Sequence, residues 1–117
     1  MSECTVQTVT IRCGGGCGLI CTSRGKKRHC WGGCSSVLKT HPAGDSTSKE
    51  EAIEAIQKAE SIHFVVKQMK FSNVAKFLGE VLPHSVVAPE GREEELVDRN
   101  FEGKLEDLVR ELKLKKT

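Results

Sequence analysis

The first 41 residues contain few of the large apolar side chains that build a hydrophobic core. These are limited to Val6, Val9, Ile11, Leu19, Ile20, Trp31, Val37 and Leu38. A segment this poor in core residues usually needs a metal ion or disulfides to hold a fold. All six cysteines of the chain lie in the same segment, at Cys4, Cys13, Cys17, Cys21, Cys30 and Cys34. The part of the chain with the least hydrophobic support therefore carries every candidate crosslink.

Two kinds of apolar segment are also missing. The N-terminus has neither the apolar run nor the cleavage-site pattern of a secretory signal. No segment approaches the roughly 20 apolar residues that span a bilayer. We therefore expect a cytoplasmic protein. In a reducing cytosol, cysteine pairs at short spacing favour metal binding over disulfides.

The sequence shows no catalytic pattern. We find no Ser-His-Asp arrangement with supporting motifs, no phosphate-binding glycine loop before a helix, and no carboxylate pair that can be placed together. The run Gly14–Gly16 is flanked by cysteines and suits a metal-binding loop better than a phosphate loop. We therefore expect a protein that is not an enzyme.

The cysteine spacing predicts a structural zinc site. Cys13, Cys17, Cys30 and Cys34 follow the pattern Cys-x3-Cys-x12-Cys-x3-Cys. Two cysteine pairs joined by a hairpin of about a dozen residues match a tetrahedral Cys4 site, and the flanking glycines allow sharp turns. Four thiolates leave no open position for water, so this zinc would be structural.

Other ligand sets stay open at this point. Cys17-x3-Cys21 has the same spacing, so Cys21 could replace Cys13, and Cys4 could supply a fourth ligand. Two histidines are further candidates: His29 and His41. The two remaining cysteines would be free thiols or a Cys4–Cys21 disulfide, because two cysteines cannot close a second tetrahedral site.

The pattern along the chain predicts an α+β protein in three parts. Residues 1–41 are expected to form the zinc ribbon, a small antiparallel sheet with short strands over Thr5–Arg12, Leu19–Thr22, Lys27–Cys30 and Ser35–Thr40. Cys13–Gly18 and Cys30–Cys34 are predicted to be glycine-rich loops, and Ser23–Lys26 a turn with Gly25 at positive φ. Residues 42–47 have the composition of a linker, and residues 48–117 are predicted to be mostly helical.

Helical signals dominate after the linker. Ser48-x-x-Glu51 is a capping box at the start of a helix. Val74, Phe77, Leu78 and Val81 form an i, i+3, i+4, i+7 stripe that ends before Pro83. A longer stripe through Val97, Phe101, Leu105, Leu108 and Leu112 predicts another helix, with a bend at Gly103. The segment Ile62–Phe71 is ambiguous, and we favour a strand there.

Part of this pattern resembles a known family. The strand before Cys13, the Ser23-Arg24-x-x-Lys27-Arg28 hairpin tip, the second cysteine pair, a short strand and an acidic-capped helix follow in order. The run from Ile11 to Glu60 resembles an uncharacterised archaeal family of small rubredoxin-like zinc-ribbon proteins. Those relatives have tighter cysteine spacing within each pair. The resemblance implies zinc ligation and no known activity.

The charge distribution predicts a nucleic-acid partner. Residues 1–41 hold six Lys and Arg and one Glu, a net +5, whereas residues 42–117 hold 12 Lys and Arg and 15 Asp and Glu, a net −3. The predicted hairpin gathers most of these cations beside one aromatic ring: Arg24, Lys26, Lys27, Arg28, His29 and Trp31. Cations at such a tip can reach phosphates, and an indole can stack on a base. We predict binding to RNA rather than DNA, or to a ribonucleoprotein such as the ribosome.

Two other functions fit parts of the sequence. The acidic run Glu93–Glu95 would repel phosphates, which favours a protein–protein adaptor in a transcription or translation assembly, with the C-terminal helices as the contact surface. Four thiolates could instead hold iron in a rubredoxin-like electron carrier.

Overall fold

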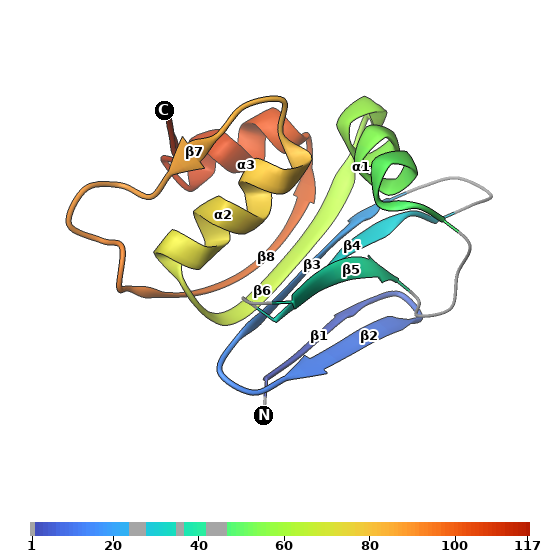
Figure 1. The fold of residues 1–117 in the computed structure, drawn as a ribbon, viewed down its shortest axis with the longest axis horizontal. Coiled ribbons are helices and arrows are strands. Elements are labelled where there is room, and N and C mark those ends of the chain that lie inside the picture. The colour runs from blue at the N-terminus through green and yellow to red at the C-terminus, as the bar shows by residue number, and fades with distance from the viewer. Residues whose placement is uncertain (1, 24–27, 35–36, 42–46) are drawn as a thin grey trace.

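One five-stranded antiparallel sheet organises the chain (Figure 1). The computed structural model describes residues 2–23, 28–34, 37–41 and 47–117. The strand order is β5-β4-β3-β6-β8. The strands span Cys17–Thr22 (β3), Cys30–Cys34 (β4), Val37–His41 (β5), Ile62–Lys70 (β6) and Leu96–Gly103 (β8). Strands from before and after the predicted linker thus lie next to each other, and residues 42–46 of that linker lie outside the described residues.

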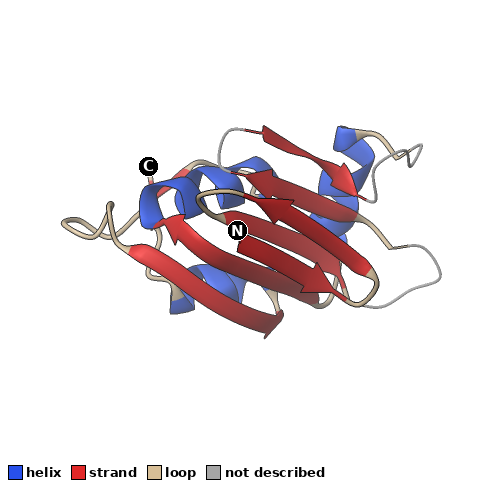
Figure 2. Cartoon of the chain, turned by 90° about the horizontal axis from the view of Figure 1, so that it is seen from below, coloured by secondary structure: helices blue, strands red, loops and turns tan. Residues whose placement is uncertain are grey.

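A two-stranded hairpin covers one face of this sheet. It consists of β1 (Ser2–Val6) and β2 (Val9–Cys13), joined through Gln7, which has a φ of 53°. Both strands alternate strictly between buried and exposed residues, as expected for a ribbon with one face on a core. Figure 2 shows the strands in front of the helices from this side. The single strand predicted over Thr5–Arg12 is therefore two strands.

Three helices pack on the opposite face. They are α1 (Lys49–Lys58), α2 (Phe71–Val81) and α3 (Leu105–Glu111). Two short strands, β7 (Val86–Val87) and β9 (Lys115–Lys116), pair with each other beside α2. The core under the helices joins residues from the whole chain, including Ile20 and Trp31 from the N-terminal strands. Within this core the rings of Phe64 and Phe77 pack edge-to-face, with their centroids 5.9 Å apart.

The predicted fold class is wrong. The chain is mostly β, and it is not a small N-terminal ribbon followed by a mostly helical region. Two local errors account for most of the difference. Cys30–Cys34, predicted as a loop, is strand β4. The stripe from Val97 to Leu112, predicted as one helix, is strand β8 followed by helix α3, with the break at Gly103.

Other local predictions are confirmed. Ser48 caps α1, and its side chain accepts a hydrogen bond from the Glu51 backbone N–H at 3.1 Å. The stripe that begins at Val74 lies within α2, and all four of its residues are buried. The ambiguous segment is strand β6, which lies between β3 and β8 in the sheet.

Candidate functional site

All six cysteines lie in one apolar layer between the β1–β2 hairpin and the sheet. Period-two alternation turns Cys17, Leu19 and Cys21 of β3 toward the hairpin, and turns Ile20 toward the helices. The hairpin contributes its own inward-facing residues to the same layer. The layer consists of Cys4, Val6, Val9, Ile11, Cys13, Cys17, Leu19, Cys21, Cys30 and Val65, with Cys34 at its margin.

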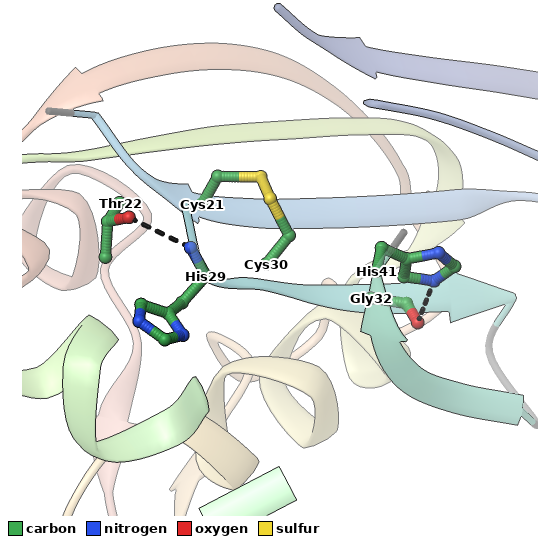
Figure 3. Close-up of a disulfide and its surroundings, with 6 residues drawn as sticks. All are labelled: Cys21, Thr22, His29, Cys30, Gly32 and His41. Atoms are coloured by element: carbon green, nitrogen blue, oxygen red, sulfur yellow. Dashed lines mark hydrogen bonds between the residues drawn. A yellow bond between two sulfur atoms is a disulfide. The ribbon is translucent and has the colours of Figure 1, made fainter. Parts of the chain in front are cut away.

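Cys21 and Cys30 form a disulfide across β3 and β4 (Figure 3). The two residues are direct partners in the strand register, with their Cα atoms 4.1 Å apart. The neighbouring pair along the two strands, Thr22 and His29, is hydrogen-bonded, since the Thr22 backbone N–H donates to the His29 carbonyl at 3.0 Å. The cysteine pair therefore occupies a non-hydrogen-bonded position, where opposing side chains lie closest. The Cys4–Cys21 disulfide considered from the sequence is not the one formed.

The structure separates the four predicted zinc ligands. Cys30 and Cys34 lie at opposite ends of β4, four residues or about 13 Å apart, whereas sulfurs around one zinc ion lie within roughly 4 Å of each other. Cys17 and Cys34 do come together as register partners. In the described part of the chain, no three His, Cys, Asp or Glu side chains are grouped as a metal ion would require. Zinc binding stays a prediction.

Cys4, which the sequence suggested only as a spare ligand, is the nearest sulfur neighbour of Cys17. The two Sγ atoms lie 2.9 Å apart, and Cys4 Sγ also lies 3.3 Å from the Cys17 carbonyl oxygen, to which it donates. Cys13 instead donates to the carbonyl of Gly16 within its own loop. The four free cysteines are therefore Cys4 and Cys17 in contact, Cys34 opposite Cys17, and Cys13 bonded locally.

Burial keeps the Cys4 and Cys17 thiols protonated. Burial, followed by the hydrogen bond with Cys4, raises the pKa of Cys17 from 9.0 to about 12. Burial also raises the pKa of Cys4, against the opposing effect of its bond with Cys17. Both groups are therefore neutral thiols at physiological pH.

This shift predicts a loss of stability in alkali. Above pH 9 the unfolded chain loses the Cys17 proton while the folded chain keeps it, so deprotonation favours unfolding. We expect Cys17 to lower the free energy of unfolding by about 1 kcal/mol at pH 10 relative to pH 8. Urea denaturation of the wild type and of Cys17→Ala at pH 8 and pH 10 measures this loss. It is the amount by which the free energy of unfolding falls further in the wild type than in the variant. Equal pH dependence in the two proteins would contradict it.

A groove of about 460 Å³ runs beside the sulfur layer, between β2 and β5 with the end of β4 as its floor. Its residues are Thr8, Val9, Thr10, Ile11, Arg12, Gly33, Cys34, Val37, Lys39 and His41. This lining offers two cations and two hydroxyls, and no described Asp or Glu belongs to it. Arg12 forms an exposed ion pair with Glu3 at 3.1 Å on the neighbouring strand. Burial lowers the pKa of His41, whose Nε2 lies 3.2 Å from the Gly32 carbonyl oxygen (Figure 3).

The predicted nucleic-acid residues fall into three groups. Arg24, Lys26 and Lys27 lie outside the described residues. Arg28 and His29 are half-buried, and Arg28 Nη1 and His29 Nδ1 have no hydrogen-bond partner among the described residues. Trp31 is only 4% exposed and packs in the core under the helices, with Lys49 Nζ 5.4 Å from its ring centroid. This indole therefore offers no open face to a base.

Sequence reasoning missed the groove, although part of its pattern is visible in the sequence. Thr8, Thr10 and Arg12 alternate with the inward-facing residues of β2, and Val37, Lys39 and His41 alternate along β5. Such alternation identifies one face of each strand, but it does not show that the two faces meet. Their meeting depends on how the hairpin lies over the sheet.

Comparison of the chain with protein-family models, curated proteins and solved structures found no match. Among the described helices, none is long and apolar enough to cross a membrane. Function therefore has to be argued from the residues of the site.

Proposed function

We propose that the protein is a non-enzymatic, cytoplasmic nucleic-acid-binding protein that holds phosphates along the β2–β5 groove and the neighbouring β3–β4 hairpin. The groove carries this proposal, because Arg12 and Lys39 line it together with two threonine hydroxyls. Lysine, arginine and hydroxyl side chains supply most protein contacts to phosphate oxygens. RNA, free or within a ribonucleoprotein, is the expected partner.

The strand register connects the groove to the basic hairpin. His41, at one end of the groove, pairs with Cys30, the first residue of β4. Arg28 precedes Cys30 by two residues and has an unpartnered guanidinium nitrogen. A phosphate chain that follows β5 past His41 therefore arrives at the end of the sheet where Arg28 lies.

Two carboxylates of the acidic run Glu93–Glu95 form ion pairs with nearby cations. In Figure 1 the loop between β7 and β8, which carries Glu93–Glu95, is at the left of the molecule, whereas the end of β3 and the start of β4 are at the right. Glu94 pairs with Lys70 at 3.0 Å, and Glu95 pairs with Arg92 at 2.7 Å. These carboxylates are thus partly neutralised, which removes the main argument for the protein–protein adaptor.

The size of the groove favours a single strand. A volume of about 460 Å³ is far too small for a double helix. Single-stranded loops and ends are the parts of RNA that proteins most often recognise. Zinc binding at the predicted cysteines stays a separate prediction, and no step of the RNA binding depends on it.

We expect affinity for a 15-nucleotide single-stranded RNA of mixed sequence to fall steeply with salt. With four or five phosphates neutralised, the log–log slope should lie between about −2 and −4, since each contact contributes about −0.7 on a single strand. The double substitution Arg12→Gln with Lys39→Gln should make the slope shallower by about 1.4 and weaken binding at least tenfold at 0.1 M salt. Fluorescence anisotropy across a salt series measures both quantities.

The matched control is Lys115→Gln with Lys116→Gln, which removes two exposed cations from β9 instead. It should bind with the wild-type slope. If the groove variant also keeps the wild-type slope while circular dichroism shows it folded, the groove is not the site. If the wild-type protein binds no RNA at 50 mM salt, the proposed function is wrong and the adaptor hypothesis stands.

A further inference from the structure

One of the four free cysteines differs from the others in its surroundings. Cys4, Cys13 and Cys17 are buried, whereas Cys34 is partly exposed and lies on the floor of the groove. Two cations, Arg12 and Lys39, line the same groove. Reactive cysteines in proteins occupy positively charged, partly exposed sites of this kind, whereas a dissolved oxidant does not reach fully buried cysteines directly.

Cys34 also faces a second thiol. It is the register partner of Cys17, four residues along the same strand pair from the Cys21–Cys30 disulfide. Positions along an antiparallel pair alternate with a period of two, so Cys17–Cys34 is the same close, non-hydrogen-bonded type of pair. The geometry that holds one disulfide between β3 and β4 is therefore repeated at Cys17 and Cys34.

Cys17 has another possible partner on its other side. Cys4 of the hairpin places its Sγ 2.9 Å from Cys17 Sγ. Cys17 therefore lies between a partly exposed thiol on the sheet and a buried thiol on the hairpin. This order, from groove to interior, is Cys34, Cys17 and Cys4.

We propose that these three cysteines form a site that peroxide oxidises. Peroxide reacts first with Cys34, Cys34 then forms a disulfide with Cys17, and exchange with Cys4 leaves a Cys4–Cys17 disulfide. The Cys34 thiolate attacks one peroxide oxygen, the O–O bond breaks, and the sulfur becomes a sulfenic acid while one water is released. The Cys17 thiol then attacks the Cys34 sulfur and its proton passes to the departing hydroxide. The S–O bond breaks, and a second water leaves as the Cys17–Cys34 disulfide forms. Two thiols and one peroxide thus give one disulfide and two waters.

A thiol exchange completes the sequence. The Cys4 sulfur attacks Cys17, the Cys17–Cys34 bond breaks, and Cys34 leaves as a thiol. The product is a Cys4–Cys17 disulfide that joins β1 of the hairpin to β3 of the sheet. Cys34 is then free to react again. The oxidation needs no bound nucleic acid, although Cys34 lies in the same groove as the proposed phosphate contacts.

The test treats the full-length protein with one equivalent of hydrogen peroxide, in the presence of a chelator so that no bound metal shields the thiols. We expect the number of free thiols, titrated after denaturation, to fall from four to two. Peptide mapping should find Cys4–Cys17 beside the existing Cys21–Cys30 disulfide. Cys34→Ser should slow the loss at least tenfold, because the peroxide then has only buried thiols to react with.

Two further variants separate the steps. Cys17→Ser should form no second intramolecular disulfide, and a dimedone-type probe should label its Cys34 as a sulfenic acid. Cys4→Ser should stop at the Cys17–Cys34 disulfide. The inference is overturned if the wild type keeps four thiols in peroxide, if Cys34→Ser reacts at the wild-type rate, or if the new disulfide contains Cys13. RNA binding by unoxidised protein is unaffected by any of these results.

Discussion

A fragment of residues 48–117 is expected to remain unfolded in isolation. Its central strand β6 pairs with β3 along six residue pairs, from Cys17–Lys67 to Thr22–Ile62, and removal of residues 1–41 would leave that whole edge unpaired. The fragment would also lose Ile20 and Trp31 from the core under its helices, and the hairpin that covers Val65. A sheet reduced to β6 and β8 is a two-stranded ribbon, which is marginal at best in water.

Circular dichroism and amide NMR of the fragment measure this outcome. We expect a disordered spectrum with no cooperative thermal transition, whereas the full chain should show one transition that includes both helices and strands. The change in composition around residues 42–47 predicts the opposite, a C-terminal part that folds alone. A fragment with dispersed amide signals and a sharp melting transition would support that division, and would mean that β3 is dispensable for the core.

The elements that the sequence predicts correctly are those specified by local patterns. The Ser48 cap and the stripe of α2 each depend on residues within one or two helical turns, and both occur as expected. The stripe from Val97 fails because positions 97 and 101 fit both periods: they are i and i+4 on a helix, and they also share one face of a strand. Pairing with β6 across the sheet decides for the strand, and Gly103 ends it.

The cysteine layer, too, could be predicted from the sequence only in part. Cys17-x-Leu19-x-Cys21 already indicates one face of a strand, and Cys4-x-Val6 another, so the sequence alone allows each set to be grouped. The glycines around the cysteines favour metal-binding loops over strands. In the structure, β4 is a strand despite those glycines. The contact between Cys4 and Cys17 depends on how the hairpin lies over the sheet, which no local pattern specifies.

Gly32 explains why a strand can contain the sequence that looked like a loop. It pairs with Leu19 in the middle of the β3–β4 ladder. A Cβ atom at this position would lie 2.2 Å from the Gly18 carbonyl oxygen and 2.9 Å from the Leu19 Cα, and both are backbone atoms that cannot rotate away. Glycine thus allows β4 to approach β3 at this point, as glycines within strands often do.

Gly32→Ala is therefore expected to lower the free energy of unfolding by about 3 kcal/mol or more, because β4 must move away from β3 and disturb the ladder on both sides. The disulfide at Cys21–Cys30 holds one end of the same ladder, so the displacement should concentrate at the other end, between Cys17 and Cys34. Urea denaturation at pH 7 measures the loss.

The matched control is Gly79→Ala in α2, where the added Cβ would meet only the Val86 backbone nitrogen at 4.0 Å. That substitution should stabilise the protein by about 0.5–1 kcal/mol, since alanine is the better helix former. If Gly32→Ala unfolds at the wild-type urea concentration, β3 and β4 do not approach as closely as the structure places them. Cys17 and Cys34 would then lose the close pairing on which their oxidation to a disulfide depends.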